Sequence, residues 1–334
     1  MNYYIVEGEI RNNIGDVLQG MVAEPFLPEP KKAVNRENLS SLPKTEPAFM
    51  IGNGWYMHHF ESFPPPKNII PFYLSVHIAD SAMLRIERIR NHFKEHAPIG
   101  CRDQKTLKLF LGWGIPAYYS GCLTTTTCAR KAINNSNNGE VLLVDNVDHP
   151  VPDAVVEKLE QLTNSKLIRV SHDPEQTEGS FEDYVKAGKD QMERLLERYC
   201  DAKLIFTTKI HCTLPCLGMG ANVVLIHPNP NDPRLETVNE FMETVSYESI
   251  LKMSSFKRPK VDYVKLQERQ HFLKNIVTKS VELRKNSVQF GETSYFQNLK
   301  RKSERKAKLY NRMMLLMFKL GLKRKDLQRI YGLK

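Results

Sequence analysis

Short β-rich runs alternate with helical stretches along most of the chain, and this alternation restricts it to few folds. Strands that alternate with helices form parallel sheets with helices on both faces. The first series of runs is Tyr3–Val6, Phe49–Gly52, Ile69–Ile78 and Ala97–Gly100, and the second is Val141–Val144, Lys166–Val170, Leu204–Thr207 and Val223–Ile226. Helical stretches near Asp153–Leu162 and Phe181–Tyr199 interrupt the second series. The pattern predicts an α/β protein, with surface loops at Glu24–Lys44 and Phe63–Lys67.

A polar segment, Asn134–Gly139, separates the two series. It is rich in turn-forming residues and contains no apolar side chain, so we interpret it as an interdomain linker. The length of 334 residues is about twice that of a usual domain, which favours two domains. We therefore predict α/β domains at residues 1–133 and 140–250, and a helical, strongly basic segment at 251–334.

The net charge of +10 is distributed unevenly along the chain. Residues 251–334 contain 23 Lys and Arg but only 6 Asp and Glu, a net charge of +17, so the preceding residues carry −7. Such a basic segment predicts a polyanion or an anionic membrane surface as its partner.

The most basic part of this segment, Lys300–Lys334, contains an apolar stripe at helical spacing. The stripe consists of Leu309, Met313, Leu316 and Leu320, widened by Met314, Leu315, Met317 and Phe318 and flanked by Lys306, Lys308, Arg312 and Lys319. A basic amphipathic helix suits an anionic lipid interface, but a terminal helix that packs on its own domain has the same pattern. Nucleic acid is not expected as a partner, because no binding motif or regular interleaving of aromatic and basic residues occurs.

The sequence favours a cytoplasmic protein, which the basic segment could hold peripherally on the inner face of the cell membrane. No run of about 18 apolar residues occurs, and the N-terminus lacks the regions of a signal peptide. The six cysteines are therefore expected to be reduced thiols. Cys212 and Cys216 have helical spacing but no second thiol pair nearby, so we interpret them as packing residues rather than zinc ligands.

Polar residues that follow the predicted strands are the candidates for a functional site, because open α/β sheets bind ligands at the carboxyl ends of their strands. Asn13 and Asp16 lie in a glycine turn before a helix, where a carboxylate can accept hydrogen bonds from sugar hydroxyls. An ordinary helix start has the same appearance. After the next strand, Trp55 could stack on a sugar ring. His58 and His59 could be acid–base groups, although structural histidines are more common.

Two later strand ends carry positive charge. Arg102 stands at the N-terminus of a helix that begins near Asp103, and such a position favours an anion. The stretch Ser120–Thr127 offers hydroxyl and backbone N–H groups to the same anion. Lys209 and His211 are two residues apart, so in an extended segment their side chains would leave on one face. A cation beside an imidazole can bind an anion and transfer a proton.

The order and spacing of four motifs resemble the polysaccharide pyruvyl transferase family over about residues 10–230. These motifs are Asn13-Ile-Gly-Asp16, Gly100-Cys-Arg-Asp103, Ser120-Gly-Cys-Leu-Thr124 and Thr208-Lys-Ile-His211. The resemblance implies two Rossmann-like domains that face each other across a cleft, as in GT-B glycosyltransferases. It also implies that the enolpyruvyl group of phosphoenolpyruvate is transferred to two hydroxyls of one sugar, as a pyruvate ketal on a capsular polysaccharide or exopolysaccharide precursor. The basic tail favours a polyprenyl-linked acceptor.

The resemblance also implies roles for single residues. His211 is the expected acid, and it would act as imidazolium with a resting pKa near 6.5 that phosphate raises. Together with the residues argued above, it gives as candidates around the donor Arg102, Lys209, Ile210, Ser120, Gly121 and Thr124. The candidates on the acceptor side are Asn13, Asp16, Trp55 and His58. Lys209 replaces the family's usual arginine and therefore lacks a bidentate fork. No metal or other cofactor is implied.

Two other function classes remain open. A nucleotide-sugar-dependent glycosyltransferase could have the same two-domain shape, since a fold does not determine a function. Such an enzyme usually contacts a base and a ribose, yet no clear acidic ribose ligand follows the strands of the second series. A binding protein without catalysis, docked through its basic end, would leave the polar motifs at the strand ends unexplained.

Overall fold

The computed structural model describes the chain except for residues 9–12, 135–137, 146, 176–177, 286–292 and 320–334. The strands of the first sheet are β1 (Asn2–Glu7), β2 (Lys31–Asn35), β3 (Ala48–Tyr56), β4 (Ile69–Ile78), β5 (Ile99–Cys101) and β6 (Ala117–Tyr119). Those of the second sheet are β7 (Val141–Asp145), β8 (Leu167–Ser171), β9 (Leu204–Thr207), β10 (Val223–His227) and β11 (Val245–Ser246). The helices are α1 (Gly15–Ala23), α2 (Glu87–Glu95), α3 (Gln104–Gly112), α4 (Asp153–Thr163), α5 (Phe181–Asp201), α6 (Ile210–Met219), α7 (Glu236–Asn239), α8 (Tyr247–Lys252), α9 (Tyr263–Lys285) and α10 (Ser294–Lys319).

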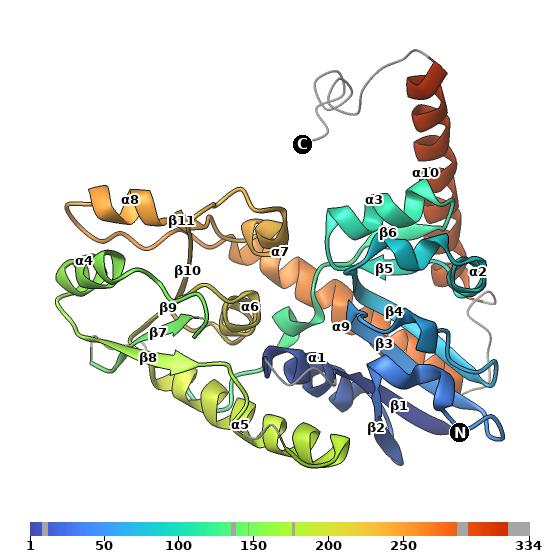
Figure 1. Cartoon of the computed structure of the whole chain (residues 1–334), viewed down its shortest axis with the longest axis horizontal. Helices are drawn as coiled ribbons and strands as arrows, with labels where there is room; N and C mark the ends of the chain where they lie inside the picture. Colours follow the sequence, from blue (N-terminus) through green and yellow to red (C-terminus); the bar gives the residue numbers. More distant parts are fainter. Residues whose placement is uncertain (9–12, 135–137, 146, 176–177, 286–292, 320–334) are drawn as a thin grey trace.

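The two sheets are parallel and share one strand order. The first sheet runs β2-β1-β3-β4-β5-β6 and the second runs β8-β7-β9-β10-β11. In each sheet the order reverses beside the first strand, between β1 and β3 and between β7 and β9 (Figure 1). The crevice at such a reversal, outside the carboxyl ends of the strands, is the usual ligand site of an open α/β sheet. The predicted mixed α/β fold with two parallel sheets is confirmed.

Alternate residues of the strands face different apolar clusters, as the two-residue period of a strand requires. In β1, Tyr3 and Ile5 belong to the largest cluster, and Tyr4 and Val6 to a cluster on the other face. The largest cluster also contains Leu142 and other residues of the second sheet, together with residues of α1, α5, α6 and α9. One continuous apolar layer therefore joins the two sheets. The boundaries predicted for the two domains stay a prediction, and the linker Asn134–Gly139 is described only in part.

The prediction of a surface loop at Glu24–Lys44 is wrong. This stretch contains the edge strand β2 and a following 3₁₀ helix in which Arg36, Glu37 and Leu39 are buried. The charged pair can be buried because Arg36 Nε donates a 3.2 Å hydrogen bond to Glu37 Oε1. In the second predicted loop, Phe63 is also buried, and its ring stacks on that of Phe93 at 5.2 Å between centroids.

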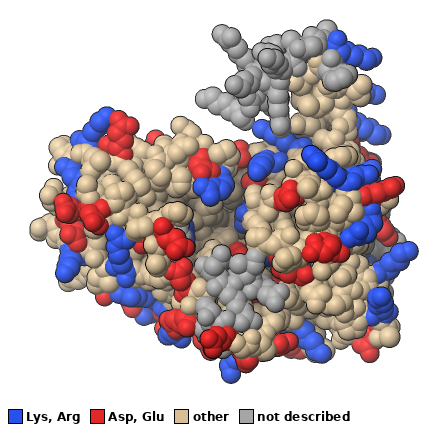
Figure 2. All heavy atoms as spheres, in the orientation of Figure 1, with Lys and Arg blue, Asp and Glu red and all other residues tan. Residues whose placement is uncertain are grey.

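Helix α10 packs on the first sheet mainly through residues outside the predicted stripe, of which only Met317 is buried among the residues described. It lies against α3 and β6 and buries Phe296, Ser303, Ala307 and Met317. Leu309, Leu315 and Leu316 remain exposed, so the apolar residues do not form one packing stripe. Leu320 and the side chain of Phe318 lie outside the described residues. Figure 2 shows Lys and Arg side chains along the outer edge of α10.

The helices and the cysteines bear on two further predictions. None of the described helices is long and apolar enough to cross a membrane. Cys212 and Cys216 are fully buried in the largest apolar cluster, in agreement with their interpretation as packing residues. Both carry free thiols, as do the other four cysteines.

Candidate active site

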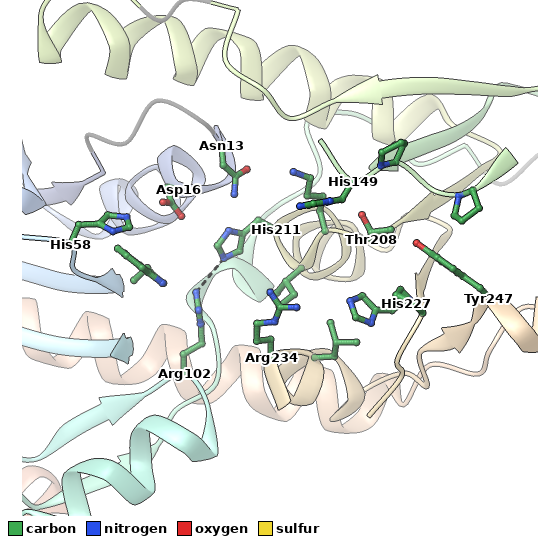
Figure 3. Close-up of a pocket in the computed structure, with 17 residues that line it drawn as sticks. Asn13, Asp16, His58, Arg102, His149, Thr208, His211, His227, Arg234 and Tyr247 are labelled. Atoms are coloured by element: carbon green, nitrogen blue, oxygen red, sulfur yellow. Dashed lines mark hydrogen bonds between the residues drawn. The ribbon is translucent and has the colours of Figure 1, made fainter. Parts of the chain in front are cut away.

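A pocket of about 770 Å³ lies where the carboxyl ends of the two sheets meet (Figure 3). Eight of the eleven predicted site residues line it: Asn13, Asp16, Trp55, His58, Arg102, Lys209, Ile210 and His211. Trp55 lies near the end of β3, and the others follow β1, β3 and β5 of the first sheet and β9 of the second. The pocket thus joins the two reversal points of strand order, which explains why motifs more than one hundred residues apart share one site.

The start of α1 lies directly against His211 of α6. A Cβ atom on Gly15 would lie 2.8 Å from the Cβ of His211 and 3.0 Å from its Nδ1, so only glycine permits this approach. The side chain of Asn13 accepts a 3.1 Å hydrogen bond from the Gly15 amide and fixes the turn. The glycine motif of the first sheet therefore positions the imidazole of the second.

Arg102 reaches the pocket from the end of β5. Its amide donates a 2.8 Å hydrogen bond to Val76 O, and the next residue, Asp103, caps α3 by accepting a 2.8 Å hydrogen bond from the Thr106 amide. Arg102 Nη1 lies 3.5 Å from His211 Nε2, across the pocket (Figure 3). No carboxylate of the described residues forms an ion pair with Arg102. Its charge is therefore available to an anionic ligand.

His211 differs from the sequence prediction in two ways. It lies in the first turn of α6 rather than in an extended segment, because Lys209 is the N-cap and Ile210 begins the helix. Burial and the Arg102 guanidinium lower the pKa of His211 to about 3, so the expected resting value near 6.5 is wrong. An anion that neutralises Arg102 would remove part of this shift and favour the imidazolium.

Lys209 lies at the pocket end nearest the second sheet. Burial lowers its pKa, and three nearby carboxylates oppose that shift, those of Asp173, Asp145 and Asp148. Its amide donates a 3.0 Å hydrogen bond to Thr207 Oγ1, which fixes the turn between β9 and α6. These carboxylates offset part of the positive charge of Lys209, whereas no carboxylate of the described residues forms an ion pair with Arg102.

The wall near the first sheet is held by a buried arginine. Arg36 Nη2 lies 3.6 Å from Asp16 Oδ2, and the guanidinium stands 5.3 Å from the ring centroid of Trp55. Glu37 Oε2 accepts hydrogen bonds from the amides of His58 and His59 at 2.9 and 2.8 Å. The predicted aromatic and acidic groups therefore form one braced wall. Sequence reasoning missed both members of the brace, because they lie in the stretch taken for a loop.

The predicted pocket residues lie within a stretch of sequence that matches a known protein family. The model of the family described as polysaccharide pyruvyl transferase matches residues 13–230. The chain belongs to this family. No curated protein matches it. Membership makes the chain a transferase that moves pyruvyl groups to polysaccharide, and every predicted pocket residue lies within the matched range.

Three residues predicted to bind the donor of this pyruvyltransferase do not line the pocket. Ser120 and Thr124 are fully buried, and Ser120 Oγ lies within hydrogen-bond distance of the Ser75 amide and of Cys101 O. Gly121 has a φ of +75° and lies against the side chain of Arg269. The structure places this turn behind the pocket, in contact with α6 and α9.

Sequence reasoning missed four residues with titratable side chains that line the pyruvyltransferase pocket, namely His149, His227, Arg234 and Tyr247. His227 ends β10, and the other three follow β7, β10 and β11 of the second sheet, so the rule that pointed to Arg102 could also have found them. Arg234 and Tyr247 lie beyond the matched range. Among the described residues, no three His, Cys, Asp or Glu side chains are grouped as a metal site. The expectation of a metal-free reaction stays a prediction.

Proposed function

We propose that this pyruvyltransferase uses phosphoenolpyruvate as donor and forms a pyruvate ketal on two hydroxyls of one sugar, in a capsular polysaccharide or exopolysaccharide precursor. In this proposal the two sheets belong to Rossmann-like domains in a GT-B-like arrangement. The contact between Arg102 and His211 carries the proposal, because it sets a free cation beside an acid–base group within one pocket. That combination suits a small anion that must accept a proton.

In this proposal the binding of phosphoenolpyruvate favours the protonated form of His211. The carboxylate of phosphoenolpyruvate binds Arg102, and its phosphate lies toward Lys209 and the start of α6, where backbone N–H groups favour an anion. The neutral imidazole of His211 then gains a proton, because the donor's negative charge offsets the Arg102 charge that lowers its pKa. The proton is therefore available only when the donor is in place.

The chemistry then proceeds with one proton donor. His211 gives its proton to the methylene carbon, which becomes a methyl group and leaves an oxocarbenium-like carbon. A sugar hydroxyl forms a C–O bond to that carbon and returns its proton to His211. The bond between the carbon and the phosphate oxygen breaks, and the second hydroxyl closes the ketal while its proton leaves on the phosphate. Trp55 and Asp16 hold the sugar on the opposite wall.

Product formation tests this function. Purified protein is incubated with phosphoenolpyruvate and a panel of saccharides, free and polyprenyl diphosphate-linked, and products are analysed by mass spectrometry. A saccharide that gains one pyruvate ketal, and that gains none with His211→Ala, is the expected result. Transfer of a sugar from a nucleotide sugar to the same panel, without ketal formation, would favour the glycosyltransferase alternative.

A peripheral membrane position belongs to the same proposal. The outer face of α10 presents Leu309, Leu315 and Leu316, which are 69%, 59% and 55% exposed. The exposed basic residues around them are Arg301, Lys302, Arg305, Lys306, Lys308, Arg312 and Lys319. Each basic residue near an anionic leaflet contributes about 1 kcal/mol. Leucines between such charges suit insertion into a lipid interface, where a polyprenyl-linked acceptor resides.

A further inference from the structure

We infer that Arg234 is a third cation of the donor site and binds the phosphate of phosphoenolpyruvate. This inference rests on the proposed function, because it concerns the donor of that reaction. Arg234 lines the same pocket as Arg102 and His211 but lies beyond the residues matched by the family. Its assignment therefore comes from the geometry of this chain.

A carboxylate fixes the position of Arg234 at the pocket edge. Asp232 Oδ2 accepts a 2.7 Å hydrogen bond from Nη2 of Arg234, and both carboxylate oxygens lie 3.1 Å from its Nε. Asp232 Oδ1 also accepts a 2.8 Å hydrogen bond from the Arg234 amide, at the start of a 3₁₀ turn that Leu235 anchors in the core. The pair lowers the pKa of Asp232 to about 2, so the carboxylate stays charged.

This arrangement leaves one edge of the guanidinium for a ligand. Nη1 of Arg234 donates to no residue that the structure describes, and the side chain is 73% exposed. Figure 3 shows Arg234 between Arg102 and His227. A guanidinium held by a carboxylate on one edge presents its remaining donors in a fixed direction, which suits two oxygens of one phosphate.

The charge of the donor favours a further cation in the site. A carboxylate and a phosphate ester together carry about three negative charges at neutral pH. The cations that the sequence motifs provide are Arg102 and Lys209, and Lys209 is a single point charge that already faces three carboxylates. Among the described lining residues Arg234 is the remaining permanent cation, and it brings the total to three.

The position of Arg234 favours the phosphate rather than the carboxylate of the donor. Arg234 follows β10 of the second sheet, on the side of the pocket where His227 and the start of α6 also lie. Arg102, by contrast, reaches the pocket from the first sheet. Because phosphate is the leaving group, an exposed arginine can hold it during bond cleavage and then release it to solvent.

The test is calorimetric titration of phosphoenolpyruvate, inorganic phosphate and pyruvate into wild type and Arg234→Gln. The change should weaken binding of phosphoenolpyruvate and of phosphate about tenfold or more, because hydrogen bonds to charged groups are lost, while pyruvate binding is unchanged. Arg198→Gln is the control, since Arg198 also binds one carboxylate, that of Glu140, and does not line the pocket. A second variant, Lys209→Arg with Arg234→Gln, should recover part of the affinity, because the guanidinium at position 209 can donate two parallel hydrogen bonds to the phosphate.

The outcomes separate the two proposals. If wild type fails to bind phosphoenolpyruvate, the proposed function is wrong and the role of Arg234 is lost with it. If wild type binds and Arg234→Gln binds equally well, the function stands and the inference is overturned. A loss of pyruvate binding with unchanged phosphate binding would also overturn it, because Arg234 would then hold the carboxylate.

Discussion

His211 lies in a position that keeps its imidazole neutral until a ligand arrives. Burial and the Arg102 guanidinium lower its pKa to about 3, whereas the unfolded chain has an ordinary histidine value near 6.5. Between these pH values the unfolded state binds more protons than the folded state. The effect of His211 on the free energy of unfolding is therefore to leave it unchanged above about pH 6.5 and to lower it progressively as the pH decreases toward 3.

We therefore expect His211→Gln to reduce the acid sensitivity of the fold. Urea unfolding at pH 7 and pH 5 should show a smaller loss of stability for the variant than for wild type, because one group that takes up a proton on unfolding is gone. An equal loss in both proteins would mean that His211 is not held neutral.

The close approach of Gly15 gives a second residue-scale prediction. Alanine at this position would place a methyl group 2.8 Å from the Cβ of His211, so the imidazole must shift. Gly15→Ala should reduce ketal formation at least tenfold while circular dichroism shows an intact fold, since small displacements of catalytic groups are costly. Gly112→Ala is the control, because its methyl group would meet only Tyr310, at 3.8 Å. Unchanged activity in Gly15→Ala would exclude the proposed positioning.

At the scale of elements, the start of α3 joins stability to ligand binding. Asp103, the residue after Arg102, accepts a hydrogen bond from the Thr106 amide. Its other carboxylate oxygen lies 2.6 Å from His77 Nδ1. Asp103→Ala should lower the free energy of unfolding by about 1 kcal/mol and also weaken phosphoenolpyruvate binding, because the cap that orients Arg102 is lost. Asp80→Ala, which removes the cap of a short helix outside the pocket lining, should affect stability without affecting binding. Equal donor affinity in both variants would contradict the positioning role.

Helix α10 is the element on which membrane contact depends. Replacing Leu309, Leu315 and Leu316 by serine should reduce sedimentation with phosphatidylglycerol vesicles, and binding by wild type should fall as salt increases. Leu251→Ser is the control, because Leu251 is 48% exposed on α8. If the triple variant sedimented as wild type does, the outer face of α10 would not be the lipid contact.

The elements that sequence reasoning found and those that it missed differ in their burial. The run Ile69–Ile78 is almost wholly buried and became β4 with the predicted bounds. Strand β2 was missed because it is an edge strand whose residues, apart from Val34, stay partly exposed, and because it lies in a Pro-rich stretch. Ser120 and Thr124 show a different limit, since sequence does not reveal whether a hydroxyl meets a ligand or another group of the protein, here Cys101 O and the Cys122 thiol.

The whole molecule makes one site from two similar sheets. Each sheet contributes the reversal point of its strand order, and the apolar layer between them keeps those points together. The strand-end rule could predict eight of the pocket residues from sequence, since each lies at or after the end of a strand. The relative position of the two sheets depends on tertiary packing, which no local sequence pattern shows. The contact between Arg102 and His211 depends on the same packing.

The central claim is that this pocket binds phosphoenolpyruvate through Arg102. The most direct measurement is the thermal stability of wild type and Arg102→Gln with phosphoenolpyruvate and, separately, with nucleotide sugars. A ligand at one hundred times its Kd stabilises the folded state by about 2.7 kcal/mol. We expect phosphoenolpyruvate alone to stabilise wild type and to have little effect on the variant. Stabilisation by a nucleotide sugar instead, or equal stabilisation of both proteins by phosphoenolpyruvate, would contradict this claim.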